Sequence, residues 1–341
     1  GILQKESDSE LKACMNIIPL HSTIPQNEQQ KVFFPADEGT VKVILATNIA
    51  ESSVTIDDVL VVIDGGLCRE MNYSAERSMS EMVTVPISKA SATQRLGRAG
   101  RVAPGWCYRL YSKGQHHAML ERPQPEIQRT ALEATCLNTI NMTVKGVETF
   151  LSRAMDPPSS GDVAHAMERL RKLGAVTSDG SNEALTPLGS CLARLPLDPA
   201  VAKMLIMGSV LQCLDPVLTA AACSSSRDIF YAPLGMRKEQ HNVKKTFSET
   251  SDTMASVEAY DEFQYILKEH GWEEARAWAS ANFVSIHTLT SVTSVRWQLI
   301  SELQALGLVS HSDLVTSRGK TKEFRHDALV NRNAGIDSLI T

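Results

Sequence analysis

The sequence has no long apolar run, no leader-like start and no paired cysteines. No stretch approaches the ~18 uninterrupted apolar residues of a membrane span, so we expect no membrane contact. Residues 1–6 lack the charged end and apolar core of a signal peptide. They also lack an initiator methionine, so we expect a piece of a longer chain.

The seven cysteines are scattered without a C-x-x-C pair, which argues against a zinc ribbon or a disulfide framework. This pattern indicates reduced, mostly buried thiols in an intracellular protein, nuclear or cytoplasmic. The 341 residues are 43% apolar and 21% charged, typical of globular material in about two to four domains. With 34 basic and 39 acidic residues, the net charge of −5 does not by itself indicate a nucleic-acid binder.

The first ~110 residues have α/β character, because short runs rich in β-branched residues alternate with polar or glycine-rich segments. The buried runs predict parallel strands. The expected elements are a helix at 27–34, strands at 41–47, 59–64 and 81–86, a hairpin over 69–80 that leads into the last strand, and a helix at 93–101.

From about residue 114 the pattern becomes mainly helical. A helix that opens at Pro125, another over 163–173 and a turn at 178–182 indicate a small winged-helix-like unit. Beyond Thr186 the apolar spacing predicts a helical bundle. Its expected helices lie at 200–214, 253–269, 273–279 and 295–306. The last ~20 residues are polar, and we interpret this tail as cut.

The densest chemical signal is the segment QRLGRAGR at 94–101. Arg95, Arg98 and Arg101 recur every three residues on one side of the expected helix, and the small residues between them leave room for a ligand. A row of permanently charged guanidinium groups suits a polyphosphate. Residues 94–122 hold six cations against one acid. The alternative is a solvated basic helix neutralised by its neighbours.

This segment resembles motif VI of the superfamily-two helicases, in the form of the DEAH-box family. The segment ATNIAESSVTI at 46–56 resembles motif V of that family. PLHS at 19–22, with Gln29 and Phe33 after it, resembles its motif IVa region. Further similar strings are VPISKASA at 85–92, PEI at 125–127, LTPLG at 185–189, and the segments 102–111 and 214–218, the last two favouring the RNA-helicase-A-like branch.

The chain also departs from that family. Ser52 stands where motif V usually has threonine. There is no G-x-x-x-x-G-K-[ST] phosphate loop, because Leu314 occupies the first glycine position ahead of residues 319–321, and there is no D-E-A-H. The resemblance therefore implies a chain without the first RecA-like domain.

The implied fold is α/β, a parallel-sheet RecA-like domain followed by a winged-helix domain and an α-helical ratchet bundle. The implied boundaries are 1–113 for an N-terminally truncated second RecA-like domain, 114–182 for the winged helix, 183–318 for the ratchet bundle, and 319–341 for a linker or the start of a truncated OB-like domain.

In this family ATP lies between two RecA-like domains. The resemblance implies that Arg98 and Arg101 reach the β- and γ-phosphates, one of them as an arginine finger, and that Gln94 orients the attacking water. For Arg95, a ligand contact and a packing or salt-bridge role both stay open.

The resemblance also implies contacts to the rest of the nucleotide. Phe33 would stack on the base, although Phe34 could do so instead and either ring could be core. Thr55 and Asp57 would lie near the ribose, with a helix N-cap as the alternative for Asp57.

Thr47 and Asn48 follow a buried strand, at the end where open α/β sheets place ligands. The resemblance implies that they contact the RNA backbone, with a strand-end turn as the alternative. His21 and Ser22 would touch RNA phosphates, unless the histidine is buried in a loop. The stretch 69–80 resembles the family's strand-separating hairpin. Helical spacing favours the core for Trp272, Trp278 and Trp297.

The resemblance implies part of an ATP-dependent RNA helicase that couples ATP hydrolysis to 3′–5′ translocation and unwinding. ATP and Mg²⁺ would be held mainly by the missing RecA-like domain, so we expect no metal ligands here and no ATP hydrolysis by these residues alone. The expected partners are RNA and that domain, and we expect a monomer. The alternatives are a catalytically silent RNA-binding or scaffold module, and a translocase on DNA or four-stranded nucleic acid.

Overall fold

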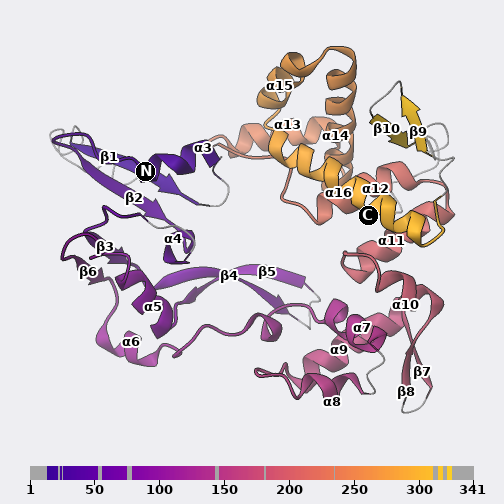
Figure 1. Ribbon diagram of the computed structural model, residues 1–341, viewed down its shortest axis with the longest axis horizontal. Coiled ribbons are helices and arrows are strands. Elements are labelled where there is room, and N and C mark those ends of the chain that lie inside the picture. Colours follow the sequence, from indigo (N-terminus) through magenta and orange to yellow (C-terminus); the bar gives the residue numbers. More distant parts are fainter. Residues whose placement is uncertain are drawn as a thin grey trace. The chain divides into compact units, whose positions relative to one another are not determined.

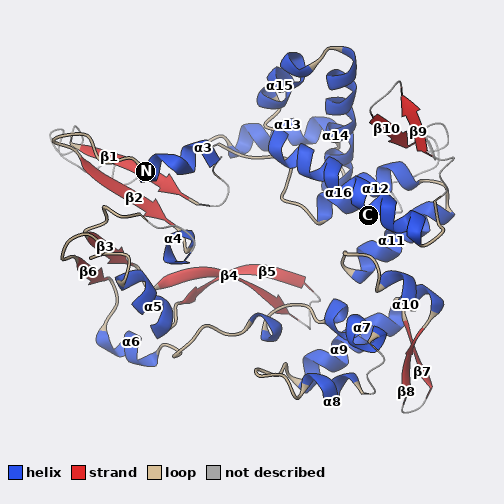
Figure 2. Ribbon diagram, viewed as in Figure 1, coloured by secondary structure: helices blue, strands red, loops and turns tan. Residues whose placement is uncertain are grey.

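The computed structural model describes residues 14–21, 24, 26–52, 56–74, 79–142, 146–179, 182–233, 235–309, 314–317 and 321–324 (Figure 1). The chain divides into two compact units, one that ends at Ala131 and one that begins at Leu132. The first unit combines short strands and helices, whereas the second is mainly helical (Figure 2). In the described ranges, no helix is both long and apolar enough to cross a membrane.

The first unit contains three pairs of strands. Its elements are β1 (Met15–Leu20), α3 (Gln26–Gln29), η1 (Gln30–Phe33), β2 (Val41–Ala46), α4 (Ile49–Ser52), β3 (Val61–Asp64), β4 (Leu67–Ser74), β5 (Met79–Pro86), α5 (Lys89–Leu96), β6 (Trp106–Arg109), α6 (Lys113–Ala118) and η2 (Glu126–Gln128). β1 pairs with β2 and β3 with β6 in parallel, and β4 pairs with β5 in antiparallel fashion. The parallel pairs confirm the α/β class.

One core of the first unit lies between β1, β2, the segment that connects them and the segment after α4. Ile18, Leu20, Val32 and Ile56 are buried together there. A parallel pair needs a crossover connection, and α3 and η1 lie in it. The register places Leu20 opposite Ala46, so both strands end at the same edge.

The predicted strands of the first unit are present, and so is the hairpin, as β4 and β5, although its tip lies outside the described residues. The sequence did not predict β1 and β6. The helix expected to open at Pro125 is wrong, because only the single 3₁₀ turn η2 forms there and the α-helix begins at Glu133. The Thr130 hydroxyl donates to the Glu126 carbonyl at 2.9 Å and so takes the acceptor that the next helical turn would use.

The second unit begins with helices and a hairpin and continues as a helical bundle. Its elements are α7 (Glu133–Asn141), α8 (Val147–Leu151), α9 (Ser160–Lys172), β7 (Val176–Asp179), β8 (Asn182–Leu185), α10 (Pro187–Leu192), α11 (Pro199–Val210), α12 (Leu214–Ser224), α13 (Arg237–Phe247), α14 (Asp252–Glu269), α15 (Trp272–Ala281), α16 (Ile286–Ala305), β9 (Leu314–Ser317) and β10 (Thr321–Phe324). β7 and β8 pair in antiparallel fashion on either side of the predicted turn at 178–182, whose residues 180–181 lie outside the described residues.

The helix expected at 200–214 is wrong as a single element, because α11 and α12 are separate helices. Gln212 between them has a φ of 58°, and the Cys213 N–H donates to the Gly208 carbonyl at 2.8 Å. A residue in this left-handed conformation ends an α-helix and caps its last carbonyls.

The bundle core lies among α12, α14, α15 and α16. Arg296 of α16 enters it, where its guanidinium donates to the Asp215 carboxylate and the Thr219 hydroxyl of α12 and lies 5.2 Å from the Tyr260 ring centroid. Trp278 packs against the same core, as expected, and its indole N–H donates to Glu262 at 3.0 Å, whereas Trp272 is exposed.

All seven cysteines lie within the described residues as free thiols. Cys136 and Cys213 are buried, Cys14 is exposed and the other four are half-buried. The expectation that most of the thiols are buried is therefore wrong.

Candidate nucleotide and nucleic-acid site

The basic segment at 94–101 spans the end of α5 and the turn after it. The Ser88 side chain caps the start of α5, and the last helical residue is Leu96. The N–H groups of Arg98 and Ala99 still donate to the carbonyls of Arg95 and Leu96, but Gly100 has a φ of 82°. Glycine in this conformation ends a helix. The expected placement of all three arginines on one side of a helix is therefore wrong, because the last two follow the helix.

The turn after α5 is held against the start of β3. A Cβ atom added to Gly105 would lie 2.7 Å from the Leu60 carbonyl oxygen and 2.8 Å from the Gly100 nitrogen. The Trp106 N–H donates to that same Leu60 carbonyl at 2.9 Å. Close backbone packing therefore fixes the loop that carries Arg98 and Arg101.

Arg95 is engaged inside the first unit. Its Nε donates to Glu51 of α4 at 3.0 Å, its Nη1 donates to Asp64 of β3 at 2.8 Å, and its Nη2 donates to the Leu67 carbonyl at 3.2 Å. The side chains of Arg95 and Glu51 are 16% and 13% exposed, and that of Asp64 is fully buried. Of the two roles left open for Arg95, the geometry favours the salt bridge.

Asp64 is the centre of this cluster. Its carboxylate also accepts hydrogen bonds from the Gly66 N–H and the Tyr111 hydroxyl, both at 2.9 Å. Burial by itself raises the pKa of a carboxyl group, but the bonds from Gly66, Arg95 and Tyr111 outweigh it, so the pKa of this one lies below its ordinary 3.8. Burial and the bond to the carboxylate raise the pKa of Tyr111 to about 12. At neutral pH Asp64 is therefore a carboxylate, Arg95 is a cation and Tyr111 is a neutral phenol.

The sequence did not single out Glu51, Asp64 or Tyr111 as parts of the site. Glu51 lies 44 residues from Arg95 along the chain, and Asp64 lies 31 residues away. The only available signals were the position of Glu51 within the motif V string and that of Asp64 at the end of a buried strand.

Arg98 and Arg101 differ from Arg95. Neither forms an ion pair with a carboxylate of the described residues, and the Arg98 Nε donates to the Gln94 carbonyl at 3.4 Å. Gln94 and Arg101 are exposed, and Arg98 is half-buried. The two guanidinium groups are therefore accessible to an anion from solvent, as a phosphate-binding role requires.

The ends of β1 and β2 bring together the residues expected to contact RNA. Thr47 follows β2 directly, its N–H donates to the Leu20 carbonyl at 3.1 Å, and its own carbonyl accepts from the first turn of α4. Thr47 and Asn48 are exposed, and half-buried His21 follows the neighbouring strand β1. Parallel strands place their carboxyl ends together, where open α/β sheets bind ligands. Ser22 lies outside the described residues.

Lys42 contacts the residues next to Phe33 and Asp57, which are expected on the base and ribose side of the nucleotide. From β2 its ammonium donates to the Phe34 carbonyl at 2.9 Å and pairs with Asp58 at 2.6 Å. The neighbouring Asp57 is exposed, and the rings of Phe33 and Phe34 are 55% and 66% exposed. Either ring is thus free to stack on a base, and the choice between them stays open. Thr55 lies outside the described residues.

Three family models match the chain. Residues 3–103 match the helicase conserved C-terminal domain. Residues 166–197 match the winged-helix part of the helicase associated domain, and residues 198–279 match its ratchet-like part. These matches define a helicase C-terminal region in which a RecA-like α/β domain is followed by a winged helix and a helical ratchet, in the expected order.

Three helicases of known name are similar to this chain over most of its length. The ATP-dependent DNA/RNA helicase DHX36 of Homo sapiens is 42% identical over 305 residues, 86% of this chain and 29% of its own length. The DExH-box ATP-dependent RNA helicase DExH1 of Arabidopsis thaliana is 40% identical over 298 residues, 87% of this chain and 29% of its own. The ATP-dependent RNA helicase DHX29 of Mus musculus is 36% identical over 316 residues, 92% of this chain and 23% of its own.

The chain thus carries the C-terminal domains of a helicase, and the relatives to which it is similar over most of its length are DEAH-box RNA helicases. It spans less than a third of the length of these relatives.

Proposed function

We propose that this chain supplies one half of the ATP site, and part of the nucleic-acid path, of an ATP-dependent helicase. The observation that carries the proposal is the contrast within one motif: Arg95 is locked in ion pairs, while Arg98 and Arg101 have no acidic partner among the described residues. A loop fixed by close packing would present these two cations to the phosphates of a nucleotide held by the first RecA-like domain.

In this arrangement each residue has a distinct task. Arg98 and Arg101 stabilise charge that develops on the transferred phosphoryl group, a role worth about 10³–10⁵ in rate. Gln94 orients the attacking water, and Phe33 or Phe34 stacks on the base. Mg²⁺ supplies further charge neutralisation when bound. The donors here are guanidinium groups, which suit phosphate oxygens and do not bind a cation, so we assign the Mg²⁺ ligands to the first RecA-like domain.

Nucleic acid would bind at the common edge where β1 and β2 end. Thr47 and Asn48 offer a hydroxyl and an amide there, and the neighbouring His21 offers a ring nitrogen. These groups suit phosphate and sugar oxygens, so the contact would be independent of base sequence. Together with ATP-driven movement of the RecA-like domains, it would advance the strand in the 3′–5′ direction.

Mutation of the two accessible arginines tests the catalytic part. In a protein with both RecA-like domains, Arg98→Ala and Arg101→Ala should each lower kcat for RNA-stimulated ATP hydrolysis by about 10³-fold. Arg122→Ala, which removes another exposed cation of the first unit, should leave kcat within twofold. These 341 residues alone should release no phosphate above background. Steady turnover by the chain alone, or equal kcat values in all three variants, would contradict the proposal.

A DNA-directed activity is the second candidate, because the relative DHX36 is named a DNA/RNA helicase. A competition experiment distinguishes an RNA-directed from a DNA-directed activity. Single-stranded RNA and DNA of matched sequence compete for binding to this chain at a stated salt concentration. An accessible and intact set of Gln94, Arg98 and Arg101 argues against a catalytically silent scaffold.

A further inference from the structure

The outer side of α13 carries a cluster of basic side chains that the site above does not use. We call it the basic face, and it consists of Arg237, Lys238, His241 and Lys245, all of them exposed. At about 100° per residue, these four positions fall within about 100° of one another around the helix axis. The one acid of the helix, Glu239, lies about 100° beyond this sector.

Lys244 and Phe247 flank the basic face on the side away from Glu239, and they anchor α13 to the bundle. Phe247 packs against the core shared by α12, α14, α15 and α16. Lys244 pairs with Asp228 at 3.7 Å and with Asp252 at 3.2 Å, and its ammonium lies 5.5 Å from the Phe230 ring centroid. These ion pairs hold the helix in place and neutralise Lys244, so Lys244 is not counted in the basic face. The four side chains of the basic face are exposed.

Among the residues that the structure describes, the cations of the basic face lack acidic partners, unlike other cations of the same unit. Arg237, Lys238 and Lys245 form no ion pair with any residue that the structure describes. The cations at the end of α9 are all paired: Arg169 with Glu133 at 2.7 Å, Arg171 with Glu183 at 3.1 Å and Lys172 with Glu168 at 3.6 Å. In a chain with a net charge of −5, three unpaired cations on one helix face form a local positive surface.

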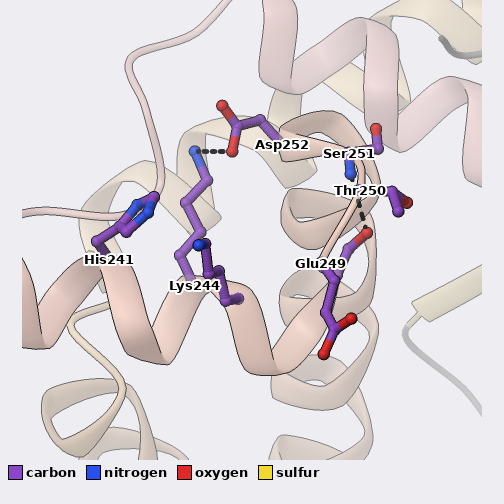
Figure 3. A pocket seen from close by; sticks show the side chains of 8 residues that line it. His241, Lys244, Glu249, Thr250, Ser251 and Asp252 are labelled. Carbon is purple, nitrogen blue, oxygen red and sulfur yellow. Dashed lines mark hydrogen bonds and ion pairs between the residues drawn. The ribbon is translucent and has the colours of Figure 1, made fainter.

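A surface pocket of about 230 Å³ lies beside the C-terminal half of this face. His241 and Lys244 line one side of it and residues 249–252 line the other, with Lys244 reaching toward Asp252 (Figure 3). Asp252 pairs with Lys244, and the Glu249 side chain also lines the pocket, so the pocket itself does not favour a lone anion. The unbalanced charge lies along the exposed helix face.

We propose that the basic face of α13 binds the phosphodiester backbone of single-stranded nucleic acid. Arg237 and Lys245 are eight residues apart, or about 12 Å along the helix axis. A stacked nucleic-acid strand carries one charge about every 3.4 Å, so the face spans about three to four phosphates. Such contacts position a strand without reading its bases. The inference rests on the proposed function, which makes nucleic acid the polyanion that this protein meets.

The test uses all 341 residues and a 15-nucleotide oligo(U) RNA with a 5′-fluorescein label. The basic-face variant is Arg237→Ala, Lys238→Ala and Lys245→Ala together. The control variant removes three exposed cations from other helices and loops of the same unit, with the same change in charge: Arg153→Ala, Lys172→Ala and Arg276→Ala. Alanine favours the helix, and circular dichroism checks that each variant keeps its helical content.

Fluorescence anisotropy at several KCl concentrations then gives Kd and its salt dependence. The basic-face variant should bind about tenfold more weakly, and the slope of log K against log salt should become smaller by about 2, close to 0.7 per lost phosphate contact. The control should change Kd less than twofold. A charge-preserving variant, Lys238→Arg with Lys245→Arg, should bind like the parent chain.

An unchanged slope in the basic-face variant, an equal loss in the control, or no RNA binding by the parent chain would each overturn the inference. So would displacement of the RNA by a poly-glutamate peptide at equal charge concentration, since the face would then be a general site for acidic protein. Thr47→Ala with Asn48→Ala separates the two proposals. If that variant binds normally while the basic-face variant does not, the strand-end contact fails and the basic face stands.

Discussion

At the residue scale, three arginines of one short segment have different surroundings. Arg95 is fixed by two carboxylates and a carbonyl, Arg98 by a single bond to the backbone of its own turn, and Arg101 is exposed. Breaking a buried pair leaves an uncompensated charge, whereas truncating an exposed cation costs little stability. Substitution of Arg95 should therefore lower the stability of the fold, whereas substitution of Arg98 or Arg101 should lower catalysis with little loss of stability.

Acid should weaken the first unit through Asp64. The folded pKa of Asp64 lies below its ordinary value of 3.8, so the ionised carboxylate stabilises the fold at neutral pH. This stabilisation is lost as the pH falls below about 4, through the folded pKa. Asp64→Asn should lower the free energy of unfolding by about 2 kcal/mol at pH 7 and flatten its decline toward pH 3.

Urea unfolding of the parent chain and the variant at several pH values, followed by circular dichroism, measures this difference. Glu28→Gln, which breaks the exposed pair with Lys31, is the control and should leave the pH dependence unchanged. Parallel pH curves for the parent chain and Asp64→Asn would show that the carboxylate does not contribute in this way.

The cysteines should differ in reactivity according to burial. Burial raises the pKa of Cys136 and Cys223 to about 12, so neither forms a thiolate at pH 8, whereas Cys14 is exposed. Treatment with iodoacetamide at pH 8 should modify Cys14 first and leave the other two unmodified until denaturant is added. Mass spectrometry of the digested protein reads this order directly, and rapid labelling of Cys136 in the folded chain would contradict it.

At the scale of elements, the turn after α5 depends on glycine at two positions for different reasons. Gly100 has a positive φ, and Gly105 has no room for a side chain against the backbone of Leu60. Gly105→Ala should destabilise the first unit by about 1–3 kcal/mol, because backbone atoms must move to admit the methyl group. Thermal unfolding measures the loss. Gly65→Ala, where nothing lies within 4 Å, is the matched control, and an equal loss there would refute the steric explanation.

The strands that the sequence predicted well are those with a clear local pattern. Residues 41–47 and 59–64 are rich in β-branched residues, and β2 and β3 form there. The end of α5 was misplaced because the glycine and alanine between the arginines were interpreted as small residues on one side of a longer helix. In fact α5 ends at Leu96, and Gly100 has a positive φ. A positive φ depends on the path of the loop, which composition does not specify.

The candidate site was predictable as a set of residues but not as a geometry. Motif resemblance supplied Gln94, Arg98 and Arg101, and their roles stay predictions. Arg95 pairs with Asp64, Lys42 pairs with Asp58, and His21 lies near Thr47. All three depend on contacts between separate segments of the chain. No local pattern encodes such contacts. The basic face of α13 was missed because the net charge of the chain is negative.

At the scale of the whole molecule, the second unit should fold by itself. Residues 132–341 form a compact unit with a buried core of their own. Expressed alone, they should show helical circular dichroism and one cooperative thermal transition. Residues 226–341 should not, since they lack α12, which packs against α14 and α16 and holds Arg296 through Asp215. Loss of cooperativity in the longer piece would show that the second unit needs the first.

The ion pairs of Arg95 predict where suppressor mutations should arise. Its acceptors belong to α4, to β3 and to the start of β4, so the segment after Asn48 and the segment before Arg98 are fastened to one guanidinium group. A nucleic-acid strand that displaced the first segment would also strain the second. By thermodynamic linkage, a change in the second segment would affect nucleic-acid binding at the first by the same free energy. Suppressors of a weakened Asn48 should therefore arise along α5, far away in sequence but one ion pair away in space.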